Sequence, residues 1–376
     1  MAKVKEYIEY ISRGISPAYD DEGITVLNQK CIRNQTILFD NARITNNIKK
    51  NVSKEKYIKN YDVLINSTGV GTLGRVAQAK NIDADITVDS HVTIVRPNLD
   101  KVNGDFFGYC FKAQENMIET LGVGATGQTE LSRDSIIENV EIPDFTFIQQ
   151  DKISNIMLHY DDLIENNNKR IKILEEMAQK IYKEWFVDFK FPNHETVTFK
   201  QTDLGSEVMP IKGKNITKAI IKKGNVPVVA GGIEPAYYHN IPNTVAPVIT
   251  VSASGANAGY INLYYQDIWA SDCSYIDTTM TPYVYYYYLL LKYNQIKVTN
   301  MQRGAAQPHV YPQDLAQLKF QVPNENIIQQ FNNSITPVFE QIANLLSKNH
   351  TLKQTRDILL PRLISGEIDV ENLEIL

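Results

Sequence analysis

Cysteine is scarce in this 376-residue sequence, and long apolar runs are missing from it. The three cysteines, Cys31, Cys110 and Cys273, are odd in number and never form a C-x-x-C pair, which argues against a disulfide framework and a zinc site. No stretch approaches the roughly 20 apolar residues that span a bilayer, and the first residues lack the apolar core of a signal peptide. We therefore expect a cytoplasmic protein without a membrane partner.

The common catalytic motifs are missing as well. The sequence has no Walker lysine motif, no H-E-x-x-H, no G-x-S-x-G, and no Asn/Asp-Pro-Pro-aromatic tetrad of the kind that holds an exocyclic amine for methylation. Gly69, Gly71 and Gly74 superficially fit the dinucleotide-binding pattern, but a β-like segment rather than a helix follows Gly74. We expect no metal, no bound cofactor and no catalytic residue in this chain, so its function should be binding.

Charge is distributed unevenly along the chain. The sequence has 38 Lys and Arg against 43 Asp and Glu, and this net charge of −5 by itself disfavours nucleic acid as a partner. Yet the segment between Ile24 and Asn60 has 8 Lys and Arg residues and only 2 acidic residues. A further 5 lysines lie between Glu207 and Glu234, a stretch without acidic residues. Local basic patches suit a protein that grips DNA with one face, although ordinary solvated loops would give the same pattern.

The chain repeats itself about 180 residues apart. Gly124, Asp134 and Pro143 have counterparts at a constant offset of 180, without a gap; the counterparts are Gly304, Asp314 and Pro323. A repeat of this length is too long for a solenoid unit of roughly 20 to 50 residues. It predicts a duplicated module with internal pseudo-twofold symmetry.

Each copy of the repeat is followed by a long segment with apolar residues at spacings of three and four, which predicts a coiled-coil helix of roughly 40 residues and about 60 Å. Neither helix could bury its apolar seam alone, so we expect the two to pack on each other in antiparallel orientation. The predicted seam residues are Ile156, Leu163, Asn167, Leu174, Ile181, Ile335, Ile342, Asn349, Leu352 and Leu359.

Four residues qualify this expectation. A buried asparagine on each seam, Asn167 and Asn349, would fix the alignment of the helices, although partial exposure of both is equally compatible with the pattern. Pro337 predicts a kink or a fresh helix start. Gly366 should end the second helix, because glycine tolerates a left-handed cap.

The predicted fold class is α+β, because β-like runs broken by turn residues alternate with the two helical segments. Two mixed β-rich domains, residues 1–145 and 190–324, would be separated by two long antiparallel coiled-coil helices. The helical segments are residues 146–189 and, with an acidic tail, 325–376. The tyrosine-rich run Tyr283–Tyr288 cannot present all its rings on one face, so we interpret it as a core helix rather than a base-stacking platform.

The two helical segments carry the most specific motifs of the chain. LEEMAQKIYKEWFVDF at 174–189 and LKQTRDILLPRLISGEI at 352–368 resemble the conserved helices of the DNA specificity subunits of type I restriction–modification systems. The resemblance implies two target-recognition domains that read a bipartite, asymmetric double-stranded DNA site across a gap set by the helices. It also implies two methyltransferase subunits that use S-adenosylmethionine on adenine N6, and two restriction subunits that use ATP and Mg²⁺.

Candidate DNA contacts follow from side-chain chemistry: amides suit adenine, Arg suits guanine, and hydroxyls suit base edges or phosphate. For each candidate, the alternative is an ordinary solvated loop residue or a turn cap. For the whole chain, the alternative is a two-domain coiled-coil adaptor without DNA contacts. In the first domain the candidates are Asn28, Gln29, Arg33, Ser67, Thr68, Arg75, His91, Thr126 and Gln128, with Lys49 and Lys50 for phosphate. In the second they are Ser252, Ser254, Asn257, Ser271, Gln302, Arg303, Gln307 and His309, with Lys222 and Lys223 for phosphate.

Overall fold

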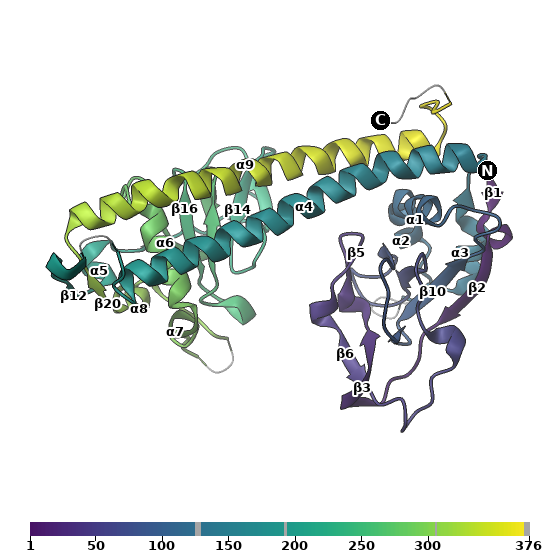
Figure 1. The fold of residues 1–376 in the computed structure, drawn as a ribbon, viewed down its shortest axis with the longest axis horizontal. Helices are drawn as coiled ribbons and strands as arrows, with labels where there is room; N and C mark the ends of the chain where they lie inside the picture. The colour runs from purple at the N-terminus through teal and green to yellow at the C-terminus, as the bar shows by residue number, and fades with distance from the viewer. Residues whose placement is uncertain (125–128, 192–193, 305–306, 372–376) are drawn as a thin grey trace. The chain divides into compact units, whose positions relative to one another are not determined.

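The structure is a computed structural model that describes residues 1–124, 129–191, 194–304 and 307–371. It divides into two compact units whose elements are labelled in Figure 1. Unit 1 comprises Met1–Ile164 and His350–Leu376, and unit 2 comprises Glu165–Asn349. Each unit therefore combines one β-rich domain with one part of each long helix.

Unit 1 is built around a four-stranded antiparallel sheet in the order β2-β10-β7-β8. In a second sheet, β6-β3-β9, strands β3 and β9 run parallel. The strands are β1 Ala2–Lys3, β2 Ile8–Arg13, β3 Tyr19–Leu27, β4 Ile32–Arg33, β5 Thr36–Ile37, β6 Arg43–Thr45, β7 Val63–Asn66, β8 Val76–Gln78, β9 Ile86–Val88, β10 Val92–Pro97 and β11 Glu141–Ile142. The helices before the long one are η1 Val4–Glu6, η2 Gln29–Cys31, η3 Phe39–Asn41, η4 Lys54–Lys56, α1 Gly104–Ala113, α2 Glu115–Thr120 and α3 Arg133–Asn139.

Strand β7 shows how the core of unit 1 is layered. Its residues Val63 and Ile65 belong to the apolar cluster that contains α1, whereas Leu64 belongs to the cluster that contains β3 and β9. Successive side chains of a strand point to opposite faces. The four-stranded sheet is therefore buried on both faces, which is why its central strands are mainly apolar.

Unit 2 repeats this architecture. A four-stranded sheet β13-β19-β16-β17 accompanies a three-stranded sheet β15-β14-β18, in which β14 and β18 run parallel. The strands are β12 Lys200–Asp203, β13 Ile211–Lys212, β14 Val226–Val229, β15 Tyr237–His239, β16 Val248–Ser252, β17 Ile261–Tyr264, β18 Trp269–Ala270, β19 Cys273–Ile276 and β20 Lys319–Val322. The helices are η5 His194–Thr196, α5 Leu204–Glu207, η6 Gly255–Asn257, α6 Val284–Tyr293, α7 Gln295–Thr299 and α8 Pro312–Ala316.

The two units match element by element in chain order, which confirms the predicted internal repeat. The gap-free register is wrong in detail, because α3 begins at Arg133 and α8 at Pro312, one residue off the 180 offset. Asp314 is consequently buried and accepts from Tyr311 N, whereas Asp134 is exposed. A larger difference lies between β3 and β6, where residues 28–42 hold η2, β4, β5 and η3, while the corresponding connection in unit 2 is the short segment 230–236.

The two predicted long helices are α4, Phe147–Phe186, and α9, Glu325–Ile364, of 40 residues each. In unit 1 the start of α4 shares an apolar cluster with the end of α9, through Met157 and Leu363. In unit 2 the end of α4 lies against the start of α9, and the rings of Phe186 and Phe331 are 4.8 Å apart. Within each unit the helices are therefore antiparallel neighbours, as predicted, and the fold class is α+β.

The predicted seam is correct for α9 and partly wrong for α4. Leu163 is 51% exposed, and its neighbour Ile164 is buried instead. Adjacent apolar residues on a helix point about 100° apart, and the sequence spacing could not choose between them. Of the other predicted seam residues, the buried ones are Asn167, Ile335, Ile342 and Asn349, and the partly buried ones are Ile156, Leu174, Ile181, Leu352 and Leu359.

The two seam asparagines are buried and bonded to each other. Asn167 Nδ2 donates to Asn349 Oδ1 at 2.8 Å, and Asn349 Nδ2 donates to Asn168 Oδ1 at 2.8 Å. A buried amide pair of this kind is satisfied in one alignment of the helices only, since a slip of either helix separates the partners.

Replacing one asparagine should therefore cost more than replacing both. Asn167→Leu leaves the buried Asn349 carbonyl without its donor, and we expect a loss of about 2 kcal/mol in the free energy of unfolding. The double variant with Asn349→Leu should recover most of it, because no orphaned amide remains. Urea unfolding in a double-mutant cycle measures this coupling, and strictly additive losses would contradict it.

Of the two effects predicted for Pro337, the fresh helix start is wrong and the kink stays a prediction. No fresh helix starts at Pro337, because α9 is continuous from Glu325 to Ile364. Pro337 is exposed, so its ring lies on the solvent side of the helix. The prediction for Gly366 is confirmed: α9 ends at Ile364, and Gly366, two residues later, has a φ of 76°.

A charged cluster joins α1, α4 and α9 within unit 1. Asp161 of α4 accepts from Arg356 at 2.7 Å, from Tyr109 at 2.8 Å and from Lys112 at 3.3 Å. Burial alone would raise the pKa of the Asp161 carboxyl, but the positive charge of Lys112 and the hydrogen bonds from Arg356 and Tyr109 outweigh it and lower the pKa. The carboxylate is thus the shared acceptor of three buried or half-buried donors.

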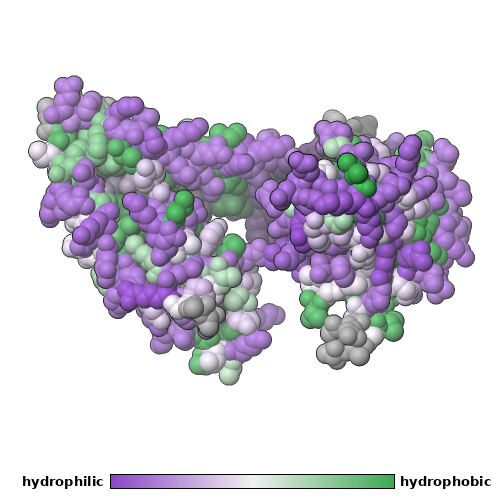
Figure 2. All heavy atoms as spheres, turned by 90° about the horizontal axis from the view of Figure 1, so that it is seen from below, coloured by the Kyte–Doolittle hydropathy of each residue, from purple (hydrophilic) through white to green (hydrophobic). Residues whose placement is uncertain are grey.

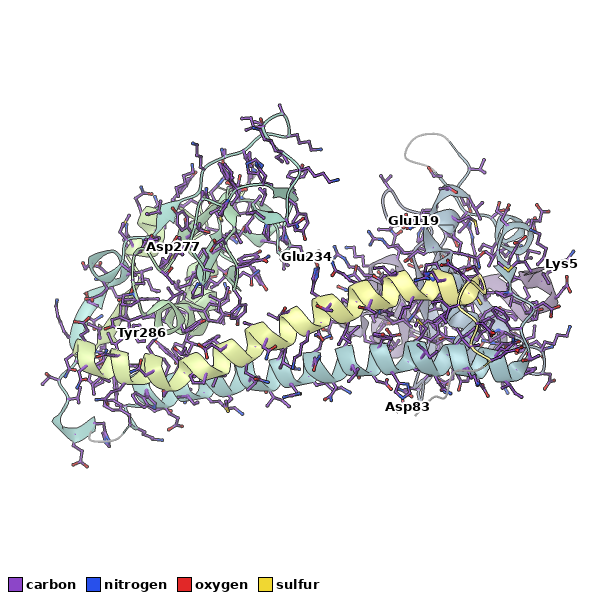
Figure 3. The ribbon with its side chains drawn as sticks, turned by 90° about the horizontal axis from the view of Figure 1, so that it is seen from above. Lys5, Asp83, Glu119, Glu234, Asp277 and Tyr286 are labelled. Atoms are coloured by element: carbon purple, nitrogen blue, oxygen red, sulfur yellow. The ribbon has the colours of Figure 1, made fainter. Side chains whose placement is uncertain are left out.

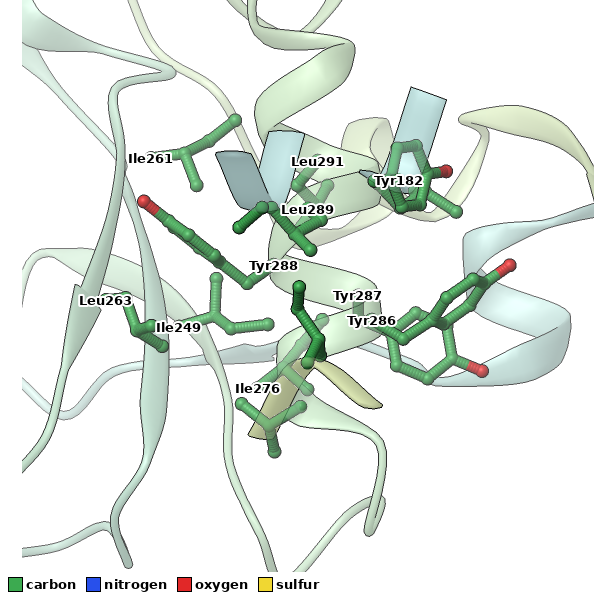
Figure 4. Packing of buried hydrophobic residues seen from close by; sticks show 14 of the residues in the cluster. Tyr182, Ile249, Ile261, Leu263, Ile276, Tyr286, Tyr287, Tyr288, Leu289 and Leu291 are labelled. Atoms are coloured by element: carbon green, nitrogen blue, oxygen red, sulfur yellow. The ribbon is translucent and has the colours of Figure 1, made fainter. Parts of the chain in front are cut away.

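The tyrosine-rich run forms a core helix, as predicted. Tyr286, Tyr287 and Tyr288 of α6 are buried in the apolar cluster of unit 2 drawn in Figure 4. Tyr285 stacks on Phe339 of α9 at 4.5 Å between ring centroids. The rings therefore hold α6 against the sheet and the long helices instead of offering a surface for bases.

The surface is mainly polar. Hydrophilic residues cover most of the face seen in Figure 2, with apolar residues in small groups between them. No helix in the described part of the chain is long and apolar enough to cross a membrane.

Candidate functional site

In both units the parallel strand pair ends at a cluster of loops. Strands β3 and β9 lead into residues 28–29 and 89–91, and β14 and β18 lead into residues 230–234 and 271–272. The carboxyl ends of parallel strands lie at the same edge of a sheet, and ligand sites commonly form there. We call the cluster in unit 1 the first edge and the one in unit 2 the second edge.

The first edge also contains residues 67–75, 121–124 and 129–131. Backbone hydrogen bonds join these loops: Ser67 N donates to His91 O at 2.8 Å, and Leu131 N donates to Ser67 O at 2.9 Å. Asn66 Nδ2 donates to Gln29 O at 3.0 Å. Segments far apart in the sequence are thereby held as one surface.

The second edge contains the corresponding loops, residues 253–260, 302–304 and 307–310. Ala253 N donates to Asp272 O at 3.2 Å, and Gly255 N donates to Pro308 O at 3.1 Å. Ser252 Oγ donates to Gly231 O at 2.8 Å. The two edges are thus built from equivalent loops by equivalent backbone contacts.

Four of the predicted DNA-contacting residues come together on the first edge. Thr68 Oγ1 and His91 Nδ1 lie 2.8 Å apart, with Gln29 and Arg75 on the adjoining loops. Arg75 donates to Gly71 O at 2.8 Å, which holds its guanidinium against the glycine loop. These side chains are exposed or half-buried, so they can reach a ligand.

Other predictions for unit 1 have different outcomes. Ser67 is fully buried and its hydroxyl lies 2.5 Å from Thr93 Oγ1, so it is not on the surface where the prediction placed it. Asn28 caps η2 by accepting from Lys30 N. Arg33 is exposed on the β4–β5 hairpin. Thr126 and Gln128 lie outside the described residues.

Six predicted residues lie on the second edge and are at least partly exposed: Ser254, Asn257, Gln302, Arg303, Gln307 and His309. Ser254 is hydrogen-bonded to Asp272, and Arg303 forms an ion pair with Asp314. Ser252 and Ser271 are buried, so their side chains are not at the surface as predicted. The three serines were wrongly predicted because each lies at a strand end, where serine is as common as in an exposed loop: Ser252 is the last residue of β16, and Ser67 and Ser271 directly follow β7 and β18.

The predicted phosphate-binding lysines are all exposed. Lys49 pairs with Asp20 at 2.7 Å, which neutralises part of its charge. Lys222 and Lys223 lie just before β14, and Lys222 N donates to His239 Nδ1 at 3.1 Å. None of the four therefore lies within the loops that form the two edges.

The sequence patterns missed the acidic groups at the edges. Asp89 is buried in the first edge and accepts from His91 N at 2.9 Å, and burial raises the pKa of its carboxyl more than this bond lowers it. Asp272 and Glu234 belong to the second edge, and Figure 3 labels Glu234 on its loop, with Asp277 in the body of the unit. Cations and amides are the side chains that the chemistry of base recognition singles out, and a carboxylate in a turn has no distinguishing sequence pattern.

The glycine-rich loop at the first edge is not a dinucleotide site. Gly74, with φ of 83°, lies against the backbone of Glu119 and leads into strand β8 rather than into a helix. Among the described residues, no group of three or more His, Cys, Asp and Glu has the geometry of a metal site. What the edges do present is a mixed set of hydrogen-bond donors and acceptors on rigid loops.

Comparisons with known proteins agree with one another. A family model described as the type I restriction modification DNA specificity domain matches residues 6–176 and 194–354. The type I restriction enzyme MjaIX specificity subunit of Methanocaldococcus jannaschii is 28% identical over 341 residues, 81% of this chain and 78% of that protein. The HindI specificity subunit of Haemophilus influenzae is 28% identical over 197 residues, 50% of this chain and 42% of that protein.

One solved structure shares the fold. The crystal structure of a type I restriction–modification system S subunit from M. genitalium aligns with a TM-score of 0.56 at 17% sequence identity, over 96% of this chain and 95% of that one. The two segments matched by the family model correspond to the two copies of the internal repeat.

Proposed function

The chain belongs to the family of type I restriction–modification DNA specificity proteins, and from this premise we propose that it reads a bipartite, asymmetric DNA site. In this proposal the first edge contacts one half-site and the second edge contacts the other. The chain itself performs no chemistry, and it positions subunits that do.

The observation that carries the proposal is the contrast between two equivalent edges. Both are assembled from the same loops at the carboxyl ends of a parallel strand pair, yet their side chains differ. The first edge offers His91, Thr68 and Arg75, and the second offers Asp272 and Arg303. Because direct readout depends on the pattern of donors and acceptors, two unlike edges predict two unlike half-sites.

The long helices would set the number of base pairs left unread between the half-sites. This is the spacing logic of dimeric DNA-binding proteins, in which half-site separation follows the geometry of the protein. The buried pair Asn167 and Asn349 supports it, since an alignment that cannot slip gives a fixed length.

The partners follow from the family. Two methyltransferase subunits would supply S-adenosylmethionine and methylate adenine N6, and two restriction subunits would use ATP and Mg²⁺. A target adenine must leave the base stack to be methylated. The edges would hold the flanking bases in register while a methyltransferase subunit takes the flipped one.

Mapping methylated adenines tests this function. The chain is combined with its methyltransferase subunit, S-adenosylmethionine and genomic DNA, and the products are sequenced for N6-methyladenine. We expect methylation confined to a two-part sequence with one fixed gap. Methylation without sequence preference would contradict the proposal, and a chain that shows no salt-dependent binding to any duplex would favour the adaptor alternative.

A further inference from the structure

Each unit carries an exposed tyrosine beneath a cation on its three-stranded sheet. In unit 1 the guanidinium of Arg43 lies over the ring of Tyr19, 3.3 Å from its centroid. In unit 2 the ammonium of Lys218 lies over the ring of Tyr237, 5.4 Å from its centroid. All four side chains are exposed.

The two pairs occupy the same place in the fold. Arg43 of β6 is paired with Val26, one residue before the end of β3, and Tyr237 of β15 is paired with Val228, one residue before the end of β14. Val26 and Val228 are themselves equivalent, since each precedes the last residue paired with the parallel strand β9 or β18. Arg43 and Tyr237 therefore stand at matching positions, each beside its edge.

The two units share a cation–ring pair at this place, but the residue types at the matching positions differ. Unit 1 places the cation on the outer strand and takes the ring from β3, whereas unit 2 places the ring on the outer strand and takes the cation from the loop before β14. The same interaction is thus made with its partners exchanged. Inheritance of the same residues from the duplication does not explain why both units have this contact, because the residues at the matching positions differ.

The chemistry of the pair indicates an anion. The described residues include no carboxylate in an ion pair with either Arg43 or Lys218, in contrast to Lys49 and its partner Asp20. A ring beneath the cation holds it in one place without neutralising its charge. A guanidinium held flat on a ring keeps its N–H groups directed outward, where they can donate to two oxygens of a phosphate.

We infer that Arg43 with Tyr19, and Lys218 with Tyr237, are two matched binding sites for backbone phosphates of duplex DNA, one beside each edge. The inference rests on the proposed function, because it assumes that the edges face DNA. Phosphate contacts fix position on the duplex and carry no base preference. The two sites would hold each half-site against its edge.

Salt dependence of duplex binding tests the sites without knowledge of the target sequence. Binding of the full chain to a fluorescein-labelled duplex of mixed sequence is measured by anisotropy between about 50 and 200 mM salt. Each lost phosphate contact should lower the slope of log K against log salt by about 0.9, so Arg43→Gln with Lys218→Gln should lower it by about 1.8. The matched control is Lys5→Gln with Lys180→Gln, two exposed lysines on η1 and α4, which should leave the slope unchanged.

A second variant separates the rings from the charges. Tyr19→Leu with Tyr237→Leu keeps both cations, so the slope should stay as in the wild type while affinity falls severalfold at every salt concentration. The sequence of the methylated site should stay unchanged in all variants. The inference is overturned if the variant with Arg43→Gln and Lys218→Gln has the same salt slope as the control variant. It is also overturned if either variant changes the sequence of the methylated site.

The phosphate sites and the proposed function can be overturned separately. If the wild-type chain binds the duplex with a steep salt dependence and the variant loses none of it, only the phosphate sites are wrong, and an acidic partner protein becomes the better ligand for them. If the wild-type chain shows no salt-dependent duplex binding, both the sites and the proposed function are overturned.

Discussion

Deleting one helical turn from both long helices should shorten the unread gap of the DNA site by about two base pairs and leave both half-sites unchanged. Four residues of helix are about 6 Å long, and the duplex rises about 3.4 Å per base pair. Methylation of the original site should be lost, and methylation of the shortened site should appear. Sequencing of N6-methyladenine in the reconstituted complex measures both.

The turn to remove is defined by the seam. Removing Glu165–Asn168 from α4 leaves buried Ile164 and Ile171 three residues apart, and removing Ser347–His350 from α9 leaves Leu345 and Leu352 three apart. Both deletions leave every seam step at three or four residues, with two successive steps of three at the junction, a change that helix pairs absorb by local overwinding. The two deletions also remove Asn167 and Asn349 together, so no buried amide is left without a partner.

The control is a deletion from α4 alone. It leaves Asn349 without Asn167 and sets the two seams out of step, so we expect loss of folded protein rather than a new gap. If the paired deletion instead altered the bases of a half-site, the helices would take part in reading and the assignment of the edges would be wrong.

The second large effect concerns the stability of unit 1. Asp161→Asn removes the carboxylate shared by Arg356, Lys112 and Tyr109. Removing one partner of a buried pair leaves an uncompensated charge, and we expect a loss of about 3 kcal/mol in the free energy of unfolding. This is at the low end of the usual range because the Asp161 side chain is 25% exposed.

The effect should depend on pH with a definite sign. The folded-state pKa of Asp161 is lowered, so its stabilising contribution is fully present above the unfolded pKa of about 3.9 and is lost as pH falls through the folded value. The difference in the free energy of unfolding between the wild type and Asp161→Asn should be constant near neutral pH and should decrease below about pH 4. Urea unfolding at several pH values measures it.

Glu165→Gln is the matched control for this prediction. Glu165 also lies on α4 and pairs with Lys169, but both side chains are more than half exposed. An exposed pair of this spacing contributes about 0.5 kcal/mol or less. If Glu165→Gln and Asp161→Asn lowered the free energy of unfolding equally, the hydrogen bonds and charges around Asp161 would have no special role in stability.

The sequence predicted the features that follow from periodicity. The two 40-residue helices, the seam positions of Asn167 and Asn349, the cap at Gly366 and the core helix around Tyr286 each follow from spacing or from the conformational preference of one residue. The internal repeat was visible because glycines and prolines at turns keep their places in both copies.

What the sequence could not predict depends on contacts between distant segments. Leu163 and Ile164 are both apolar, and only the tertiary structure decides which is buried. Ser67 directly follows strand β7, and its hydroxyl is hydrogen-bonded to that of Thr93 on β10. The Arg43 and Tyr19 pair requires the register of β3 and β6, which composition does not reveal.

The connection that follows β3 is long and structured, whereas its counterpart after β14 is short. Both connections begin at the carboxyl end of the strand, directly beside the first or the second edge. The surrounding strands and helices have the same order in the two units. Length can therefore change there without disturbing the interior, and a new recognition specificity can arise by exchange of one surface segment. Under the proposed function, a duplicated gene would in this way acquire two different DNA-reading domains on one shared framework.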